Sequence, residues 1–223
     1  MRTNPSQIDL LNQQRRQWEN TYSEEPYLYG GNPSYAARKA VALFKKEGFR
    51  NILELGCGHG RDTLFLAKNG LAVRALDYSA TALQALTKRA QELSLSESIT
   101  SLSHDVRNPL PFEDESFDAC YSHMYYCMAL TTAQLERLCS EVRRLLRPNG
   151  LNIYTVRNTR DPHYGKGTHR GEDMYESEGF IVHFFSEEKI ARLAKGFKIL
   201  NVEEFEEGDL PRHLSLVTLR KIS

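Results

Sequence analysis

The fold is decided by residues 51–62, Asn51-Ile52-Leu53-Glu54-Leu55-Gly56-Cys57-Gly58-His59-Gly60-Arg61-Asp62. An apolar run meets an acidic residue and then three alternating glycines, and a helix is expected to follow over about 63–69. Glycine tolerates positive φ and lets the backbone approach a ligand closely. The first turn of a helix presents unpaired N–H groups to the same point. This stretch therefore predicts a nucleotide-type binding turn at a strand–helix junction.

The residues around the turn argue against a dinucleotide. The dinucleotide fingerprint is G-x-G-x-x-G, and Arg61 stands where its last glycine is required. Glu54 repels a pyrophosphate and favours a cationic ligand or a free ammonium. Asp77 ends the next apolar run about twenty residues on, where an acid accepts hydrogen bonds from a ribose. Asp105 ends the third run, where an acid can read an adenine amino group. The site therefore calls for ribose, adenine and positive charge without phosphate.

Several segments in the order of a known family lie between about residues 50 and 156. They are Glu-Leu-Gly-Cys-Gly-His-Gly (54–60), Leu-Asp-Tyr-Ser (76–79), His-Asp-Val (104–106), Ser-Phe-Asp-Ala-Cys-Tyr-Ser-His (116–123) and Leu-Leu-Arg-Pro-Asn-Gly-Leu (145–151). In this order they resemble the motifs of the class I S-adenosylmethionine-dependent methyltransferases. Residues 60–67, Gly-Arg-Asp-Thr-Leu-Phe-Leu-Ala, further resemble the small-molecule branch that includes tellurite-resistance and thiopurine-type enzymes.

Hydrophobic periodicity agrees with the fold that this family implies. Strands alternating with helices predict a parallel sheet covered on both faces. Strands are expected at about 51–55, 71–76, 99–103, 117–121, 151–156, 197–205 and 213–220, and helices at about 34–47, 63–69, 80–93, 132–146 and 186–195. The resemblance implies an α/β, Rossmann-like, seven-stranded, mostly parallel sheet with helices on both faces and the last strand antiparallel.

We expect one methyltransferase domain over 1–223. Residues 1–33 form an N-terminal cap that contains a short amphipathic helix and aromatic residues, which either close over a ligand or pack on the core. Residues 34–156 form the cofactor-binding core. Residues 157–185 break the rhythm as a long Gly-, His- and Tyr-rich loop and form an acceptor-side insertion. Residues 186–223 supply a C-terminal helix and the closing strand pair.

Composition restricts the partners. Lys+Arg and Asp+Glu are both 29, so the formal net charge is zero. A phosphate backbone requires a basic surface, so no nucleic-acid partner is expected. No apolar run approaches the ~20 residues of a membrane span, and no signal-peptide core is seen near the N-terminus. The four cysteines and the histidines show no metal-ligand spacing, so no metal is expected. A reducing cytoplasm is the expected compartment.

The resemblance implies S-adenosylmethionine as the cofactor and assigns it binding residues. The glycines line the methionine part, and Glu54 stabilises either the turn or the ammonium. Asp77 holds the ribose hydroxyls, Asp105 flanks the adenine, and N-terminal aromatic residues close over the ligand. The expected cofactor-binding positions are Trp18, Tyr22, Tyr29, Glu54, Gly56, Cys57, Gly58, Gly60, Asp77, Tyr78, Ser79, Asp105, Val106, Ser122 and His123.

The acceptor side is read from residues 122–126. Family members that methylate amides or nucleobase amines carry Asn/Asp-Pro-Pro-Tyr/Phe here, whereas this chain has Ser-His-Met-Tyr-Tyr, which disfavours base methylation. His123 and Tyr126 lie where an acceptor must enter and are the candidate catalytic residues. The alternative for His123 is a histidine bonded to the backbone, and only one of the two adjacent tyrosines is expected to face the site. The expected acceptor contacts are Tyr125, Arg157, Tyr164, His183 and Arg212.

The expected reaction is in-line methyl transfer to a small-molecule acceptor. A sulfonium methyl is already activated, so the protein mainly aligns the reactants and excludes water. A base is needed only when the acceptor carries a proton that must leave. A methyltransferase acting on a protein or tRNA, and a non-catalytic S-adenosylmethionine-binding module, are the alternatives. A nicotinamide oxidoreductase is disfavoured by the glycine spacing and by Arg61.

Overall fold

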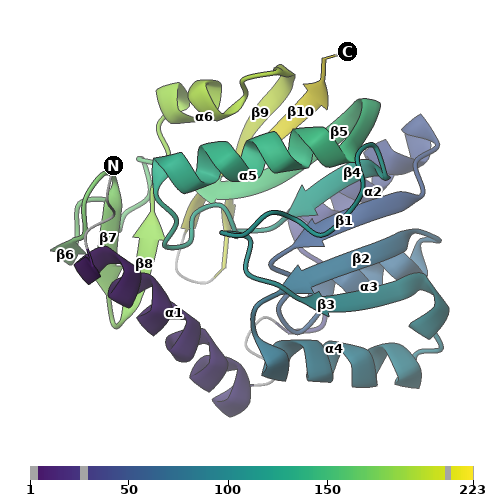
Figure 1. Cartoon of the computed structure of the whole chain (residues 1–223), viewed down its shortest axis with the longest axis horizontal. Helices are drawn as coiled ribbons and strands as arrows, with labels where there is room; N and C mark the ends of the chain where they lie inside the picture. The colour runs from purple at the N-terminus through teal and green to yellow at the C-terminus, as the bar shows by residue number, and fades with distance from the viewer. Residues whose placement is uncertain (1–4, 26–29, 209–211, 223) are drawn as a thin grey trace.

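Seven strands form one mixed sheet in the order β3-β2-β1-β4-β5-β10-β9 (Figure 1). The structure is a computed structural model that describes residues 5–25, 30–208 and 212–222, with side chains from residue 12 onward. The strands are β1 (Asn51–Leu55), β2 (Ala72–Asp77), β3 (Ile99–Ser103), β4 (Phe117–Ser122), β5 (Leu146–Arg157), β9 (Phe197–Glu207) and β10 (Arg212–Lys221). β10 is antiparallel to both of its neighbours, and β1 to β5 pair in parallel. The predicted fold class is confirmed.

Helices bury apolar faces on both sides of this sheet. α2 (Tyr35–Glu47), α3 (Arg61–Lys68) and α4 (Ala80–Glu92) contribute to one core cluster, with the sheet residues Ile52, Val73 and Ala119. α5 (Thr132–Leu145) and α6 (Glu187–Leu193) contribute to the other, with Leu53 and Leu76. Adjacent strand residues point to opposite faces, which is why Ile52 and Leu53 join different clusters.

The helix ends follow local sequence signals. The hydroxyls of Ser34 and Ser79 cap α2 and α4, and Thr131 begins α5 with a capping box that includes Gln134. Gly48 ends α2 in the left-handed conformation. A short 3-10 turn, η1 (Ser96–Ser98), leads into β3. Because these signals fix the connections, the carboxyl ends of β1 to β4 meet at one edge of the sheet.

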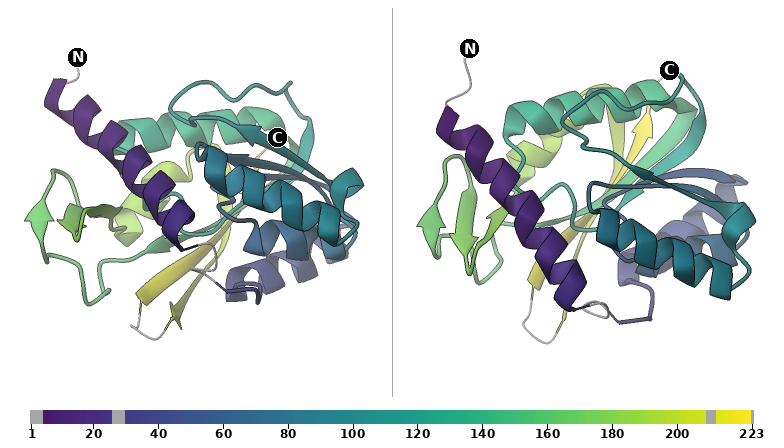
Figure 2. Two further views of the ribbon diagram at one scale, coloured as in Figure 1. Left: turned by 90° about the horizontal axis from the view of Figure 1, so that it is seen from below. Right: turned by 60° about the horizontal axis from the view of Figure 1, so that its bottom comes forward.

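The N-terminal helix is longer than expected and crosses this edge. α1 (Pro5–Glu24) is 20 residues long, whereas the sequence predicted a short helix. It runs obliquely between α4 and a small sheet (Figure 2). That small sheet, β6 (Thr168–His169), β7 (Met174–Ser177) and β8 (Phe180–His183), is antiparallel and lies within the segment predicted as a long loop. The aromatic and β-branched residues of β8 supply the strand propensity that the glycine-rich composition concealed.

In the part of the chain that the structure describes, no helix has the length and apolarity needed to cross a membrane.

Candidate functional site

The glycine turn is tied to β2 by backbone and side-chain hydrogen bonds. The amides of Gly56 and Cys57 both donate to the Leu76 carbonyl, at 2.8 and 3.1 Å. The Gly58 amide donates to Asp77 Oδ2 and the Ser79 amide to Asp77 Oδ1, each at 2.9 Å. Gly56, Gly58 and Gly60 all have positive φ. The glycines thus allow a turn that orients the Asp77 carboxylate.

The Asp77 carboxylate is suited to hydroxyl donors. It is buried, and burial raises its pKa above the ordinary value although the two amides oppose this. Each oxygen accepts one amide hydrogen and retains a further lone pair. Neutral donors such as ribose hydroxyls meet that requirement without bringing an additional charge into the site.

Glu54 is a second buried carboxyl at this edge, on β1. Its side chain is 3% exposed, and its Oε2 atom has no hydrogen-bond partner among the described residues. Burial raises the pKa of Glu54 to about 8. A buried carboxyl with one unpartnered oxygen beside the glycine turn fits a ligand that brings an ammonium group, because the cation supplies the missing donor.

Asp105, just after β3, is paired with a residue that the sequence reading missed. Arg107 Nε donates to both Asp105 oxygens at 2.9 Å. Burial opposes ionisation of Asp105, but the hydrogen bonds from Arg107 outweigh it and lower the pKa. The spacing of two residues is the local signal that would have identified Arg107. Arg107 therefore holds the Asp105 carboxylate in place at the end of β3, and the predicted contact of Asp105 with an adenine amino group stays a prediction.

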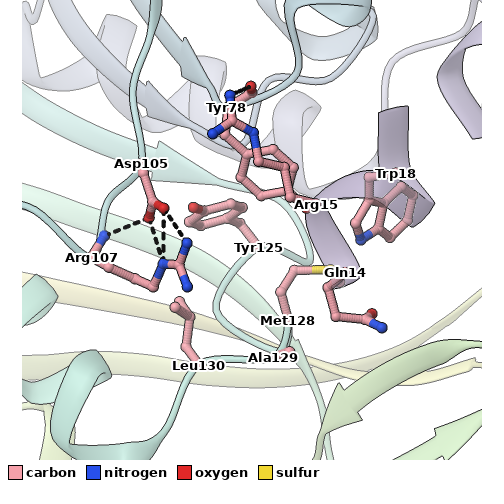
Figure 3. Close-up of a pocket in the computed structure, with 10 residues that line it drawn as sticks. All are labelled: Gln14, Arg15, Trp18, Tyr78, Asp105, Arg107, Tyr125, Met128, Ala129 and Leu130. Atoms are coloured by element: carbon pink, nitrogen blue, oxygen red, sulfur yellow. Dashed lines mark hydrogen bonds and ion pairs between the residues drawn. The ribbon is translucent and has the colours of Figure 1, made fainter. Parts of the chain in front are cut away.

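Asp105 and Arg107 line a small cavity under α1 (Figure 3). Its volume is about 30 Å³, enough for a water or two and not for a nucleoside. The Tyr125 ring lies in its centre, between Tyr78 and Asp105. The lining residues are Gln14, Arg15, Trp18, Tyr78, Asp105, Arg107, Tyr125, Met128, Ala129 and Leu130.

Tyr125 and Tyr22 both contact the glycine turn. A β-carbon added at Gly56 would lie 2.2 Å from Tyr125 Cδ2, and one added at Gly58 would lie 2.8 Å from the Tyr22 hydroxyl. The Tyr22 ring also packs edge-on against His59, with centroids 4.6 Å apart. The structure therefore brings Trp18 and Tyr22 to the site, while Tyr29 lies outside the described residues.

α1 is anchored at both sides of the cavity. The Glu19 carboxylate accepts from the Ser79 hydroxyl at 2.6 Å and from the Ala80 amide at 2.8 Å, at the N-terminus of α4. The Gln14 amide donates to the Gly179 carbonyl at 2.7 Å and accepts from the Ile181 amide at 3.0 Å, on the small sheet. The Ser79 hydroxyl, predicted as a cofactor contact, is thus engaged in capping α4 and holding α1.

His123 has side-chain partners on both ring nitrogens. Nδ1 lies 3.1 Å from Thr155 Oγ1 on β5, and Nε2 lies 3.1 Å from Glu207 Oε2 at the end of β9. The alternative of a histidine bonded to the backbone is therefore wrong. Ser122, just before it, is buried with its hydroxyl unpartnered in the described structure. Glu207 was missed by the sequence reading because no local signal links positions 84 residues apart in the chain.

Tyr126 does not face the site. Its side chain is fully buried in the core on the α5 face and stacks on Tyr154, with ring centroids 4.4 Å apart and an interplanar angle of 6°. Asn152 Nδ2 donates to its hydroxyl at 3.3 Å. The structure corrects the prediction that Tyr126 is catalytic: of the two adjacent tyrosines, Tyr125 points into the cavity and Tyr126 is a packing residue.

The predicted acceptor contacts beyond β5 mostly hold the insertion together. Arg157 is buried and donates from Nε to Asp161 Oδ2 at 2.8 Å, and Tyr164 donates to Asp173 at 3.0 Å. These engagements argue against Arg157 and Tyr164 as ligands of an acceptor, because both polar ends already have carboxylate partners.

His183 and Arg212 have different surroundings. His183 is buried, donates from Nδ1 to the Leu130 carbonyl at 2.7 Å, and accepts from Lys189 at Nε2. Arg212 lies opposite Glu207 in the β9–β10 register. His183 thus touches the cavity wall through Leu130, and Arg212 lies near the His123 partner.

Val106 and Cys57 contribute differently from the polar positions. Both side chains are buried in core clusters, Val106 on the α5 face and Cys57 on the opposite one. Burial raises the pKa of the Cys57 thiol well above its usual range. Cys57 therefore presents its backbone to the turn, and its side chain packs.

Comparison with known proteins agrees with this geometry. Residues 52–150 match the family model described as "Methyltransferase domain". Phosphoethanolamine N-methyltransferase 1 of Triticum aestivum is 32% identical over 115 residues, which are 50% of this chain and 22% of the wheat protein. The chain thus spans less than a quarter of that relative's length.

Two solved structures match nearly the whole fold. A Burkholderia thailandensis 1,6-didemethyltoxoflavin-N1-methyltransferase, solved with its acceptor and S-adenosylhomocysteine, gives a TM-score of 0.75 at 18% identity, covering 100% of this chain and 92% of that one. A magnesium protoporphyrin IX methyltransferase from Synechocystis PCC 6803, solved with bound SAM, gives 0.72 at 16% identity, covering 98% and 100%. Residues 52–150 are thus similar to a methyltransferase domain, and the two solved structures share the fold of nearly the whole chain.

Proposed function

We propose that this chain transfers the methyl group of S-adenosylmethionine to a small-molecule acceptor by in-line displacement. The observation that carries the proposal is the row of acids along one sheet edge. Glu54 lies on β1, Asp77 ends β2 and Asp105 follows β3, and these three strands are neighbours in the sheet. The row matches, in order, an ammonium, a ribose and an adenine, which is the polar sequence of this cofactor.

In this proposal each group acts on one part of the cofactor. The cofactor supplies a methyl group already activated by the sulfonium. Asp77 accepts from the ribose hydroxyls, Asp105 accepts from the adenine amino group, and Glu54 meets the ammonium. Tyr78 and Val106 flank the adenine, and Trp18 and Tyr22 on α1 exclude water. The chain accordingly comprises the cap, the cofactor-binding core, the acceptor-side insertion and the closing strands delimited above.

A small acceptor is supported by the cover over the site. Trp18 on α1 lines the cavity and packs on Phe180 of the small sheet, with ring centroids 4.9 Å apart, so α1 and this sheet cover the cavity on that side. The zero formal net charge disfavours RNA. The names of the two solved structures give 1,6-didemethyltoxoflavin and magnesium protoporphyrin IX as what the proteins methylate, and acceptors of this kind support a small-molecule acceptor here. Assignment to the tellurite-resistance and thiopurine-like branch rests on residues 60–67 alone.

The test is a screen for methyl transfer by the full chain. Small amines, phenols, carboxylates, thiols and metalloid oxyanions are each incubated with the cofactor, and S-adenosylhomocysteine is quantified, followed by a tRNA and a protein pool. Turnover with a small molecule that is lost in Asp77→Ala supports the proposal. Turnover confined to a macromolecular pool, or cofactor binding by calorimetry with no turnover anywhere, would overturn it in favour of a macromolecular methyltransferase or a binding module.

A further inference from the structure

His123 is held between β5 and β9 by two side chains of different chemistry. Its Nδ1 atom is 3.1 Å from the Thr155 hydroxyl and its Nε2 atom is 3.1 Å from a Glu207 carboxylate oxygen. The His123 side chain is 14% exposed and that of Glu207 is 22% exposed. A carboxylate at ion-pair distance from one ring nitrogen and a hydroxyl near the other are the groups by which proteins orient a histidine for proton transfer.

The Thr155 hydroxyl contacts both the loop after β4, at Met124, and the ring of His123. The Met124 amide donates to Thr155 Oγ1 at 2.8 Å, so this oxygen keeps its hydrogen for another partner. His123 Nδ1 lies 3.1 Å from this oxygen, and we assign the Thr155 hydrogen to Nδ1 and the ring hydrogen to Nε2, on the side of Glu207. Met124 itself has φ of 56°, a conformation rare for a residue with a side chain. Such strain persists where the surroundings enforce it, and functional sites are the usual place.

Other charges near the pair are Arg61 and Asp62 at the start of α3 and Arg212 opposite Glu207 in the β9–β10 register. Asp62 accepts from the Ser34 amide at 2.8 Å and from the Tyr121 hydroxyl at 2.8 Å, so it is committed to holding α2 and β4. Arg61 and Asp62 both act on Glu207 through space, with opposite sign. Burial opposes ionisation of Glu207, and the contact with His123 outweighs it and lowers the pKa of Glu207. Glu207 is therefore an anion in a half-buried site and can stabilise a positive imidazole.

We propose that Glu207 is a positioning residue for His123 and that the pair serves an acceptor carrying an N–H or O–H group. The inference rests on the proposed methyltransferase function and deepens it by naming the acceptor class. The acceptor takes the place of the Thr155 hydroxyl at His123 Nδ1 and hands its proton to that nitrogen. The bond from the acceptor atom to the methyl carbon forms as the carbon–sulfur bond breaks, and the sulfonium becomes a neutral thioether. Glu207 neutralises the imidazolium until the proton passes to water.

A thiolate or metalloid oxyanion already in its nucleophilic form has no proton to transfer. An acceptor of that kind gains nothing from a histidine held in one orientation by a carboxylate. The pair thus distinguishes between acceptor classes that the sequence left open.

The first experiment tests the pair without any turnover. The carboxyl groups of the full chain are titrated by ¹³C NMR, and the imidazole tautomer is read from ¹⁵N couplings. We expect Glu207 to titrate below the usual glutamate range, to titrate above it in His123→Ala because burial remains, and the His123 hydrogen to lie on Nε2. Glu206, the neighbouring residue that pairs with His213 at 3.4 Å, is the internal control and is expected to be unchanged. An unchanged Glu207 titration in His123→Ala would overturn the pair, whether or not the enzyme turns over.

The second experiment tests the acceptor class. With an N–H or O–H acceptor from the screen, Glu207→Gln is expected to lower kcat by about 10- to 100-fold with little change in KM, since one general-base interaction is impaired. Glu207→Asp is expected to recover part of the rate, and Glu206→Gln to retain all of it. An equal effect of Glu207→Gln on an acceptor without a proton would overturn the assigned class, because a merely structural role affects every acceptor alike.

Discussion

The phenol ring of Tyr125 lies directly against the α-carbon of Gly56, so that a β-carbon there would come within 2.2 Å of Tyr125 Cδ2. The two residues come from different connections, the turn after β1 and the loop after β4. Their contact joins the glycine turn to a residue that lines the cavity. It also makes Gly56 sensitive to substitution for two separable reasons, backbone conformation and space.

Gly56→Ala is expected to destabilise the fold more than Gly70→Ala. Both glycines have positive φ, 71° and 83°, but an added methyl group at Gly70 meets nothing within 4 Å. We expect about 1 kcal/mol of loss at Gly70 from the backbone alone and about 2–4 kcal/mol at Gly56, measured by urea unfolding. In a Tyr125→Ala background the cost of Gly56→Ala should fall toward that of Gly70→Ala. A cost that does not change in this background would refute the contact.

Asp77→Ala is expected to weaken cofactor binding by about 10- to 100-fold, because hydrogen bonds to a charged group contribute about 1.5–3 kcal/mol. The matched control is Asp118→Ala. Asp118 accepts from the Arg50 and Asn51 amides at the start of β1, away from the site. Titration calorimetry with S-adenosylhomocysteine distinguishes them, with a melting curve to verify folding. Equal weakening in both variants would place the ribose elsewhere.

The free energy of unfolding should decrease as pH rises from about 4.5 to about 8. In this range Glu54 is protonated in the folded chain and ionised in the unfolded chain. The folded pKa of about 8 lies above the unfolded value of 4.5, so folding favours the proton-bound form. Relative to Glu54→Gln, the wild-type unfolding free energy should therefore fall between about pH 4.5 and 8 by up to about 1.4 kcal/mol per unit, and then level off. Urea unfolding at a series of pH values measures the difference. A difference that is constant with pH would mean that Glu54 is ionised in the fold.

The same carboxyl distinguishes the two roles considered for Glu54. If it meets the cofactor ammonium, binding at pH 7 favours the carboxylate and releases a proton. Calorimetry in two buffers of different ionisation enthalpy should then show proton release by the wild type and none by Glu54→Gln. Binding without proton release by the wild type would leave Glu54 the role of stabilising the turn.

Glu19→Gln should loosen α1. The carboxylate accepts from the Ser79 hydroxyl and the Ala80 amide at a helix N-terminus, where a negative charge is favourable, so its loss is expected to cost about 1 kcal/mol. Hydrogen exchange in α1 should rise about fivefold. Glu24→Gln, at the exposed end of α1, is the control and should leave exchange unchanged. Trp18 is the sole tryptophan and lines the cavity, so its emission reports the same motion on ligand binding.

The central part of the fold was predictable because its signals are local. Ser34, Ser79 and Gly48 mark helix ends through the chemistry of their own turns, and the acids at 54, 77 and 105 follow apolar runs whose order dictates one sheet edge. The sequence could not decide which of Tyr125 and Tyr126 faces the site. Which of two neighbours faces a site depends on the backbone between them, and the positive φ of Met124 is not encoded by any glycine.

The sequence did not predict contacts between distant segments of the chain, and the reason is different. Glu207 meets His123 because β9 joins the sheet beyond β10, and its register brings the last residue of the strand to the site. Arg157 was predicted to bind the acceptor because of its charge, but its guanidinium pairs with Asp161, four residues later in the chain. Glu19 was different again: it shares a helix face with Arg15 and Trp18, a spacing that would have indicated its direction.

The two anchors of α1, at Gln14 and Glu19, should limit the rate of the proposed reaction. A cavity of about 30 Å³ beneath a helix fastened at Gln14 and Glu19 does not admit a nucleoside. If the cofactor occupies this cavity, we expect each cycle to include one release of at least one anchor for cofactor to enter and one for spent cofactor to leave. The turnover number cannot exceed the frequency of that release, however fast the chemical step becomes. Variants that weaken an anchor should accordingly be faster at saturating substrate and should bind cofactor less tightly, a trade of residence time against throughput.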